Sequence, residues 1–167
     1  MVHFRSHRAS DLRAGAEAAA GRGTAVENLR CQNVLDHTGI VVSNLPAARR
    51  FYDAVAGALA LETADNGDQA FLLGKSAHDP IPYLWIGTLI PSYWVEGSEA
   101  GRNQMHIAFA ATSEEQVREF HRAAIAAGGT DYGAPGPRQG AENYYGAFVL
   151  DPDGNNIEAC FRSVAAR

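Results

Sequence analysis

Three side chains in this sequence are of types that bind metal ions or move protons. His37 and His106 stand at the start of two short apolar segments, and Glu158 lies within the apolar segment "NNIEACF". A carboxylate in such a segment is costly to bury unless it is paired or bound to a metal. Two imidazoles and a carboxylate that converge form a donor set suited to Fe(II), Mn(II) or a similar ion. The alternative for each histidine is a hydrogen-bonded position in the core.

An internal repeat places the two histidines at equivalent positions. "LDHTGIVVSN" is matched by "QMHIAFAATS", and one offset of 69 residues relates His37 to His106 and Phe51 to Phe120. Both segments have the pattern of a short strand that leads into a polar helix cap. The repeat therefore predicts two structurally similar halves with one histidine in the first strand of each.

The elements that position these residues follow the same order in both halves. Helical patterns cover about 46–57 and 113–127, and each is followed by a β-rich stretch. The turn "DPDG" at 151–154 is a strong hairpin signal. We therefore expect an α+β fold with two βαβββ repeats, over about 35–88 and 104–162. These would form a mixed, curved half-barrel sheet with the helices on the outside and a concave face left open.

Composition limits the function classes. The chain has 167 residues, 46% of them hydrophobic, with a net charge of −5. The acidic balance argues against nucleic acid or a membrane surface as partner, and no apolar run approaches the roughly 20 residues of a membrane span. Two distant cysteines, Cys31 and Cys160, exclude a disulfide scaffold and favour the cytoplasm. We expect one domain over 35–162 and a tail over 163–167.

The N-terminal segment differs from the rest of the chain. Residues 1–34 are rich in Ala, Gly and Arg and contain five arginines against three acidic residues. We interpret this segment as a loosely attached extension, or as an artefact of start-site choice or cloning. A docking helix over "SDLRAGAEAAAG" and a targeting signal are the alternatives.

Three stretches carry a resemblance to a known superfamily. "LDHTGIVVSNLPAARRFYDAVAGALAL", "HIAFAATSEEQVREFHRAAIAAGG" and "YYGAFVLDPDGNNIEA" resemble the vicinal oxygen chelate superfamily. That group includes glyoxalase I, bleomycin- and fosfomycin-resistance proteins, methylmalonyl-CoA epimerase and extradiol dioxygenases. The resemblance covers about 35–162 and does not specify one activity.

The resemblance implies a metal site. His37 would take the first ligand position, His106 the third and Glu158 the fourth. The second position falls in "IPYLWIGT", where the repeat places Leu84 with Trp85 next to it, and neither side chain can ligate. Glyoxalase-type and epimerase-type sites usually have Glu or Gln there, whereas extradiol dioxygenases use two histidines and one glutamate. The ion would be Fe, Mn, Ni or Zn, with a metal-free site as the alternative.

Two adjacent tyrosines precede the last strand. Since successive residues of a strand face opposite ways, either Tyr144 or Tyr145 should point into the concave face. We assign Tyr145 a catalytic role beside Glu158 and place Tyr144 in the substrate pocket. The alternative for both is an aromatic core or rim position.

Further residues are candidates for the pocket. Trp85 and Phe71 would form an aromatic wall, and Tyr93 and Trp94 would cover the pocket or lie in a dimer contact. Arg138, in a loop rich in Gly and Pro, could hold a substrate carboxylate or phosphate, and its alternative is a solvated position.

Two functions remain open. The first is a metal-dependent lyase, isomerase or dioxygenase that acts on a small oxygen-chelating organic substrate. The second is a metal-free small-molecule or drug binding protein of the bleomycin-resistance type. The aromatic Trp85 favours the second, and the retained His37, His106 and Glu158 favour the first. The resemblance also implies a homodimer.

Overall fold

The computed structural model describes residues 35–102, 105–138 and 143–163. The chain divides into two units, Met1–Val34 and Leu35–Arg167, and all the described residues belong to the second. The predicted N-terminal extension lies outside the described residues, as do 139–142 of the predicted loop and 164–167 of the tail. No helix in the described ranges is long and apolar enough to cross a membrane.

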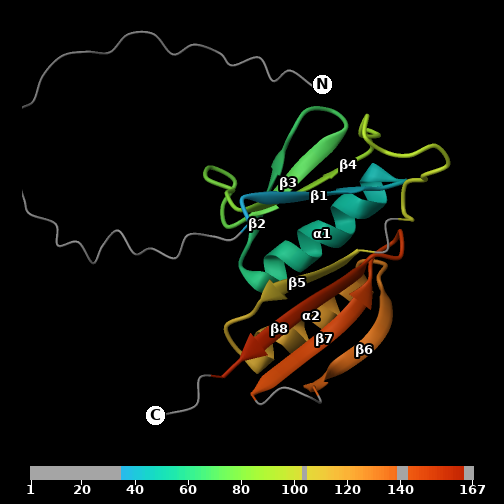
Figure 1. The fold of residues 1–167 in the computed structure, drawn as a ribbon. Helices are drawn as coiled ribbons and strands as arrows, with labels where there is room; N and C mark the ends of the chain where they lie inside the picture. The colour runs from blue at the N-terminus through green and yellow to red at the C-terminus, as the bar shows by residue number, and fades with distance from the viewer. Residues whose placement is uncertain (1–34, 103–104, 139–142, 164–167) are drawn as a thin grey trace, which may run out of the picture. The chain divides into compact units, whose positions relative to one another are not determined.

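Each half of the second unit forms a four-stranded mixed sheet with one helix (Figure 1). The first half contains β1 (His37–Val41), α1 (Leu45–Leu59), β2 (Glu62–Asp65), β3 (Ala70–Gly74) and β4 (Tyr83–Gly87). The second contains β5 (His106–Ala110), α2 (Glu114–Ala126), β6 (Thr130–Pro137), β7 (Tyr144–Leu150) and β8 (Asn156–Arg162).

The two sheets have the same strand order. It is β1-β4-β3-β2 in the first and β5-β8-β7-β6 in the second, and the first strand of each half pairs in parallel with the last. The other pairs are antiparallel. The predicted α+β fold with two βαβββ repeats is confirmed. The two sheets are separate and do not close into a barrel.

Capping interactions set where the helices begin. Asn44 accepts a hydrogen bond from the Ala47 amide at 3.0 Å and starts α1. Ser113 accepts one from the Gln116 amide at 3.1 Å and starts α2, as its position in the sequence predicts. The Gln116 side chain returns to the Thr112 amide at 2.8 Å. The caps satisfy amides that would otherwise lack partners in the first turn.

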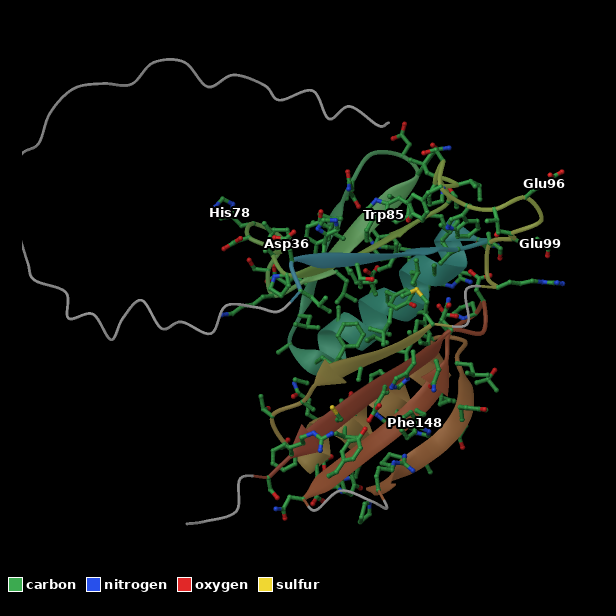
Figure 2. All side chains as sticks on the ribbon, in the orientation of Figure 1. Asp36, His78, Trp85, Glu96, Glu99 and Phe148 are labelled. Carbon is green, nitrogen blue, oxygen red and sulfur yellow. The ribbon has the colours of Figure 1, made fainter. Side chains whose placement is uncertain are left out.

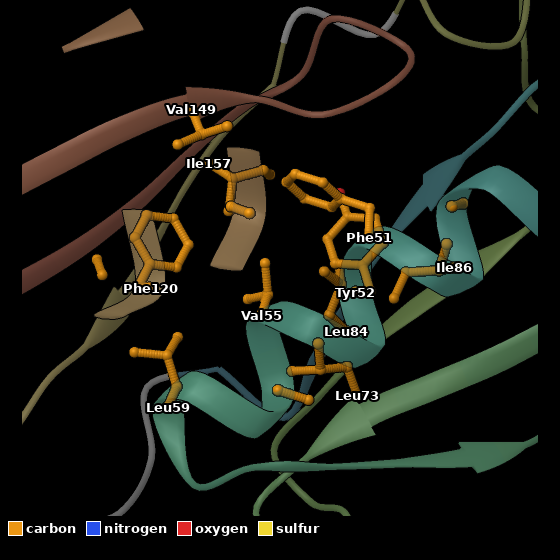
Figure 3. Packing of buried hydrophobic residues seen from close by; sticks show 14 of the residues in the cluster. Phe51, Tyr52, Val55, Leu59, Leu73, Leu84, Ile86, Phe120, Val149 and Ile157 are labelled. Atoms are coloured by element: carbon orange, nitrogen blue, oxygen red, sulfur yellow. The ribbon is translucent and has the colours of Figure 1, made fainter. Parts of the chain in front are cut away.

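One core joins the two halves (Figure 3). The helices contact each other, and each also packs against the strands of its own half. Phe51 of α1 approaches the second half so closely that a Cβ on Gly129 would lie 2.7 Å from its ring. Each sheet therefore buries one face under a helix, while no helix of the described residues lies over its other face.

A buried carboxylate links α1 to the turn between β7 and β8. Asp151 is 4% exposed and accepts the hydroxyl of Tyr52 at 2.7 Å. It also accepts the amide of Asn155 at 2.8 Å, its side-chain nitrogen at 2.9 Å, and the amide of Asp153 at 3.0 Å. Burial, followed by the charge of Asp151, raises the pKa of Tyr52 well above its usual value. The predicted hairpin turn is thus also a contact between the halves.

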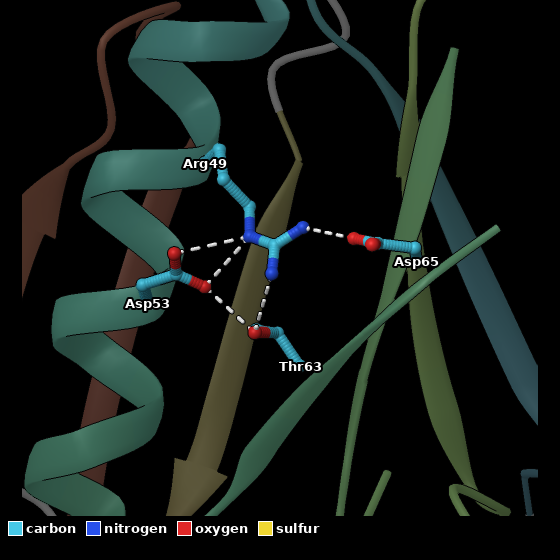
Figure 4. A network of polar contacts seen from close by, with 4 residues as sticks. All are labelled: Arg49, Asp53, Thr63 and Asp65. Carbon is cyan, nitrogen blue, oxygen red and sulfur yellow. Dashed lines mark hydrogen bonds and ion pairs between the residues drawn. The ribbon is translucent and has the colours of Figure 1, made fainter. Parts of the chain in front are cut away.

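A second polar network holds α1 against β2 (Figure 4). Arg49 donates to Asp53 at 2.9 Å and to Asp65 at 2.5 Å, while Thr63 donates to Asp53 at 2.7 Å. The Arg49 guanidinium also lies 5.1 Å from the ring centre of Phe71. These partly exposed contacts fix the rim of the first half.

The Tyr52→Phe variant tests the link through Asp151. Removing the hydroxyl leaves a buried carboxylate oxygen with one donor fewer, so the free energy of unfolding, measured in urea, should fall by about 1–3 kcal/mol. Tyr132→Phe, at a 65% exposed position, is the control and should change stability little. Equal stability of Tyr52→Phe and wild type would contradict this role.

Alkaline pH gives a second test of the same contact. The folded state raises the pKa of Tyr52. The contribution of its hydroxyl to stability is therefore complete below the pKa of about 10 that tyrosine has in the unfolded chain, and it is lost as the pH rises beyond that value. Wild type should therefore lose more stability than Tyr52→Phe above that pH. Parallel stability curves for the two proteins would refute the assignment.

Candidate functional site

The open face of the second sheet carries the predicted carboxylate. Ile157 and Ala159 of β8 are fully buried in the core, so Glu158 and Cys160 project from the opposite face. In register, Glu158 lies between Ala108 of β5 and Phe148 of β7. In Figure 1 α2 lies behind this sheet, and within the described ranges no helix covers the face that carries Glu158.

Glu158 binds two other polar side chains of this face. One carboxylate oxygen accepts the hydroxyl of Tyr144, and the other lies 3.1 Å from Nε2 of His106. The Glu158 side chain is 2% exposed, whereas that of His106 is 51% exposed. A Cβ at Gly146 would lie 2.9 Å from Oε1 of Glu158, the oxygen that accepts the Tyr144 hydroxyl. The small residue at position 146 therefore leaves the space that the carboxylate fills.

The electrostatics favour protonated neighbours around Glu158. The pKa of Tyr144 is raised to about 12, mainly by burial and next by the hydrogen bond and the charge of Glu158. Burial and the same charge raise the pKa of the Cys160 thiol. Tyr144 is therefore a hydrogen-bond donor at neutral pH. When Nε2 of His106 donates to Glu158, its Nδ1 is left as a base.

Two arginines stack on aromatic rings at this face. The Arg162 guanidinium lies 4.2 Å from the ring centre of Tyr144, and that of Arg138 lies 4.5 Å from the ring centre of Phe148. Arg138 Nη2 donates to the carbonyls of Gly133, Ala134 and Gly146 at 3.1, 2.8 and 2.7 Å. Arg138 thus fixes the end of β6 against β7, and its predicted contact with a substrate anion stays a prediction.

His37 lies in the other sheet. Its Nδ1 is 2.7 Å from Asp36, and its ring stacks on Tyr83 at 5.1 Å. Over the described ranges, no group of three or more His, Cys, Asp or Glu side chains is placed to hold a metal ion. The structure therefore brings His106 and Glu158 together, while His37 does not join them within one chain. The three-ligand metal site stays a prediction.

Two side-chain placements correct the expectations for the pocket. Tyr145 faces the helix side, where Arg118 donates to its hydroxyl at 2.8 Å, and Tyr144 takes the place beside Glu158. Phe71 is 1% exposed and packs in the core near Tyr52, because it faces α1 instead of the open face. Neither Tyr145 nor Phe71 lies at the predicted site.

The counterpart of Glu158 in the first half also differs from the expected one. Trp85 pairs with Gly39 in β1 as Glu158 pairs with Ala108 in β5. Leu84, expected at that position, is 3% exposed in the core. An indole thus stands where the second half has its carboxylate. The conclusion that this position supplies no metal ligand is unchanged.

Trp85 lines a cavity of about 280 Å³ on the first sheet. The other lining residues are Gly39, Val41, Pro91, Tyr93, Trp94 and Met105. The indole lies over Gly87, where a Cβ would come within 2.4 Å of it. Figure 2 labels Trp85 on the first half and Phe148 on the second. Trp85, Tyr93 and Trp94 thus line one cavity, and the predicted contact of Trp85 with a substrate stays a prediction.

Sequence reasoning missed Phe148 and Arg162 as parts of the site. Arg162 could have been found by strand alternation, since it lies four residues after Glu158 on the same face of β8. Phe148 required the pairing register, which places it opposite Glu158.

Comparisons with known proteins identify the superfamily of this chain. The family model described as "Glyoxalase/Bleomycin resistance protein/Dioxygenase superfamily" matches residues 34–159. The chain belongs to this superfamily, and the resemblance found in the sequence is confirmed. Comparison with curated protein sequences gave no significant match.

Solved structures resemble the second unit. A glyoxalase/bleomycin resistance protein from Albidiferax ferrireducens T118 is 33% identical, with a TM-score of 0.64, 77% of this chain covered and 98% of the other. A glyoxalase-related enzyme from Fulvimarina pelagi is 20% identical, with a TM-score of 0.60 and coverages of 78% and 88%. Lactoylglutathione lyase from Agrobacterium tumefaciens is 18% identical, with a TM-score of 0.53 and coverages of 79% and 96%. The last two show similarity of fold alone.

Titration of Tyr144 tests the site electrostatics. In Glu158→Gln, the pKa of Tyr144 should fall below about 12, because the carboxylate that raises it has lost its charge. NMR of ring-labelled tyrosine would follow the change, with Tyr144→Phe used to assign the signal. Glu119→Gln, on the exposed face of α2, is the matched control. An unchanged titration curve of Tyr144 in Glu158→Gln would show that Tyr144 and Glu158 are not in contact.

Proposed function

We propose that this protein is an enzyme that acts on a small organic substrate at the open face of the second sheet. The observation that supports the proposal is the buried carboxylate of Glu158, which binds both the Tyr144 hydroxyl and the His106 ring. Superfamily members share this fold, and the polar cluster marks where chemistry would occur in this chain.

His106 is the proton-transfer group in this proposal. Its half-exposed ring can take a proton from the substrate at Nδ1 and return it to a neighbouring atom. Glu158, 3.1 Å from Nε2, stabilises the positive charge that develops on the ring. Tyr144 donates to the other oxygen and keeps the carboxylate in place. This sequence of proton transfers suits lyase or isomerase chemistry.

The proposal includes a divalent metal ion, Fe, Mn, Ni or Zn. His106 and Glu158 offer an imidazole nitrogen and a carboxylate oxygen 3.1 Å apart, which are donor types for these ions. In the metal-bound form Nε2 of His106 would bind the ion in place of its contact with Glu158, so His106 would then be a ligand and not the proton-transfer group. When bound, such an ion polarises coordinated substrate oxygens, and with iron it would also allow dioxygenase chemistry. Because the described part of one chain does not place His37 with this pair, a third ligand from His37 requires a second copy. The proposed homodimer and the proposed metal site are therefore linked.

Glu158→Gln tests the enzyme and its metal together. We expect the anaerobically purified wild type to contain metal by elemental mass spectrometry, and the variant to lose most of it. Turnover in a screen of small compounds with vicinal oxygens should fall by up to about 10²–10⁴-fold, the range for general acid–base catalysis, because His106 loses the carboxylate that supports its proton transfer. Tyr145→Phe is the control and should retain both properties. Full turnover and metal content in Glu158→Gln would contradict the proposal.

A second candidate function is metal-free binding of an aromatic ligand at the first sheet. The cavity of about 280 Å³ lined by Trp85, Tyr93 and Trp94 favours it. Flat aromatic side chains supply large contact area for an apolar ligand. This function corresponds to the bleomycin-resistance branch of the superfamily.

Tryptophan fluorescence tests ligand binding directly. The chain contains two tryptophans, and both line this cavity, so quenching reports on its occupancy. Aromatic drug-like compounds should quench the wild type saturably, and Trp85→Phe should bind them at least tenfold more weakly. Tyr132→Phe should bind as the wild type does. No saturable quenching across the compound set would exclude this function for that set.

A further inference from the structure

Most arginines of the described residues are neutralised by neighbouring carboxylates. Ion pairs are formed by Arg49, Arg102, Arg118 and Arg122. Within the ranges that the structure describes, no carboxylate pairs with Arg50, Arg138 or Arg162. The first of these lies on α1, whereas the other two lie on the open face of the second sheet beside Glu158. In a chain of net charge −5, two unpaired cations at one site form a local exception.

Arg162 is placed to meet a ligand. It lies directly opposite Tyr144 in the β7–β8 ladder, and its guanidinium is held 4.2 Å from the centre of that ring. The side chain is otherwise exposed, so its N–H groups face solvent. Its charge acts on the site, because it lowers the pKa of Tyr144 and of Cys160 against the larger effects of burial.

Arg138 adds a fixed positive charge at the other end of the cluster. It stacks on Phe148, which lies opposite Glu158 and 6.0 Å from the His106 ring. Three carbonyls hold its Nη2, and its buried Nε has no hydrogen-bond partner. A guanidinium held in this way needs no reordering when an anion approaches, so less conformational entropy is lost on binding.

We propose that the substrate of this site is a small organic anion whose carboxylate or phosphate group binds Arg162. The inference rests on the proposed function and names its substrate class. A planar guanidinium can hold two oxygens of such a group at once, and Arg138 adds attraction from the other side. The anionic group on Arg162 places the rest of the molecule over Tyr144, whose hydroxyl binds the same carboxylate of Glu158 as the His106 ring does. Substrate charge would thus be recognised at a point separate from the proton-transfer group.

NMR titration of the full-length protein with three probes tests this proposal. Benzoate and phenyl phosphate carry the two anionic groups, and benzamide is the neutral control of similar shape. We expect at least one anion to shift the His106 ring signals saturably, and benzamide to bind far more weakly. Arg162→Gln should weaken anion binding by about tenfold or more, the usual effect of losing a charge-assisted contact. The two anions separate a carboxylate site from a phosphate site.

Arg50→Gln is the matched control, since among the described arginines Arg50 also has no carboxylate partner but lies on α1, outside the site. The proposal is overturned if Arg162→Gln binds the anions as tightly as the wild type, if both arginine variants weaken binding equally, or if benzamide binds as well as the anions. It is also overturned if no probe shifts the His106 signals. Glu158→Gln separates this result from the proposed function, because it should lose turnover while it keeps or strengthens anion binding. If only the proposed enzyme function is wrong, anion binding should still depend on Arg162.

Discussion

The contact between the Tyr52 hydroxyl and the buried Asp151 carboxylate joins the two halves of this fold. Tyr52 belongs to the helix of the first half, whereas Asp151 begins the turn that leads into β8. Because the same carboxylate also accepts three nitrogens of its own turn, it fixes where β8 starts relative to α1. Glu158 lies on that strand, so the position of the candidate site depends on a contact made at its far end. An unpaired buried carboxylate would be costly, which makes this a demanding constraint on the sequence.

The two halves use one architecture for different surfaces. The equivalent positions on the last strands hold an indole in the first half and a carboxylate in the second. Around Trp85, glycines and aromatic residues are among the neighbours that line a cavity. Around Glu158 they are a phenol, an imidazole and guanidinium groups. The repeat thus preserves backbone pairing, while the exposed face of each sheet has acquired its own chemistry.

Sequence patterns predicted the elements well, because helix caps and strand alternation are local properties. The repeat placed His37 and His106 correctly at the starts of β1 and β5, and the pattern of the segment around Glu158 correctly indicated a strand. What failed depended on register between strands. Alternation says that Tyr144 and Tyr145 face opposite ways, but the pairing with β8 decides which one meets Glu158. Likewise, no local pattern tells how two sheets lie relative to each other, so the separation of His37 from Glu158 could not be foreseen.

The shared core has a consequence for how the protein originated and folds. The helices of both halves contact each other and bury residues such as Phe51 and Phe120 in one cluster. A single βαβββ unit on its own would expose this apolar helix surface to water, at a cost of roughly 25 cal/mol per Å². The present chain should consequently fold as one cooperative unit despite its internal repeat. An ancestor with one unit would have needed a second copy to cover its helix, and duplication within one chain would have made that association permanent.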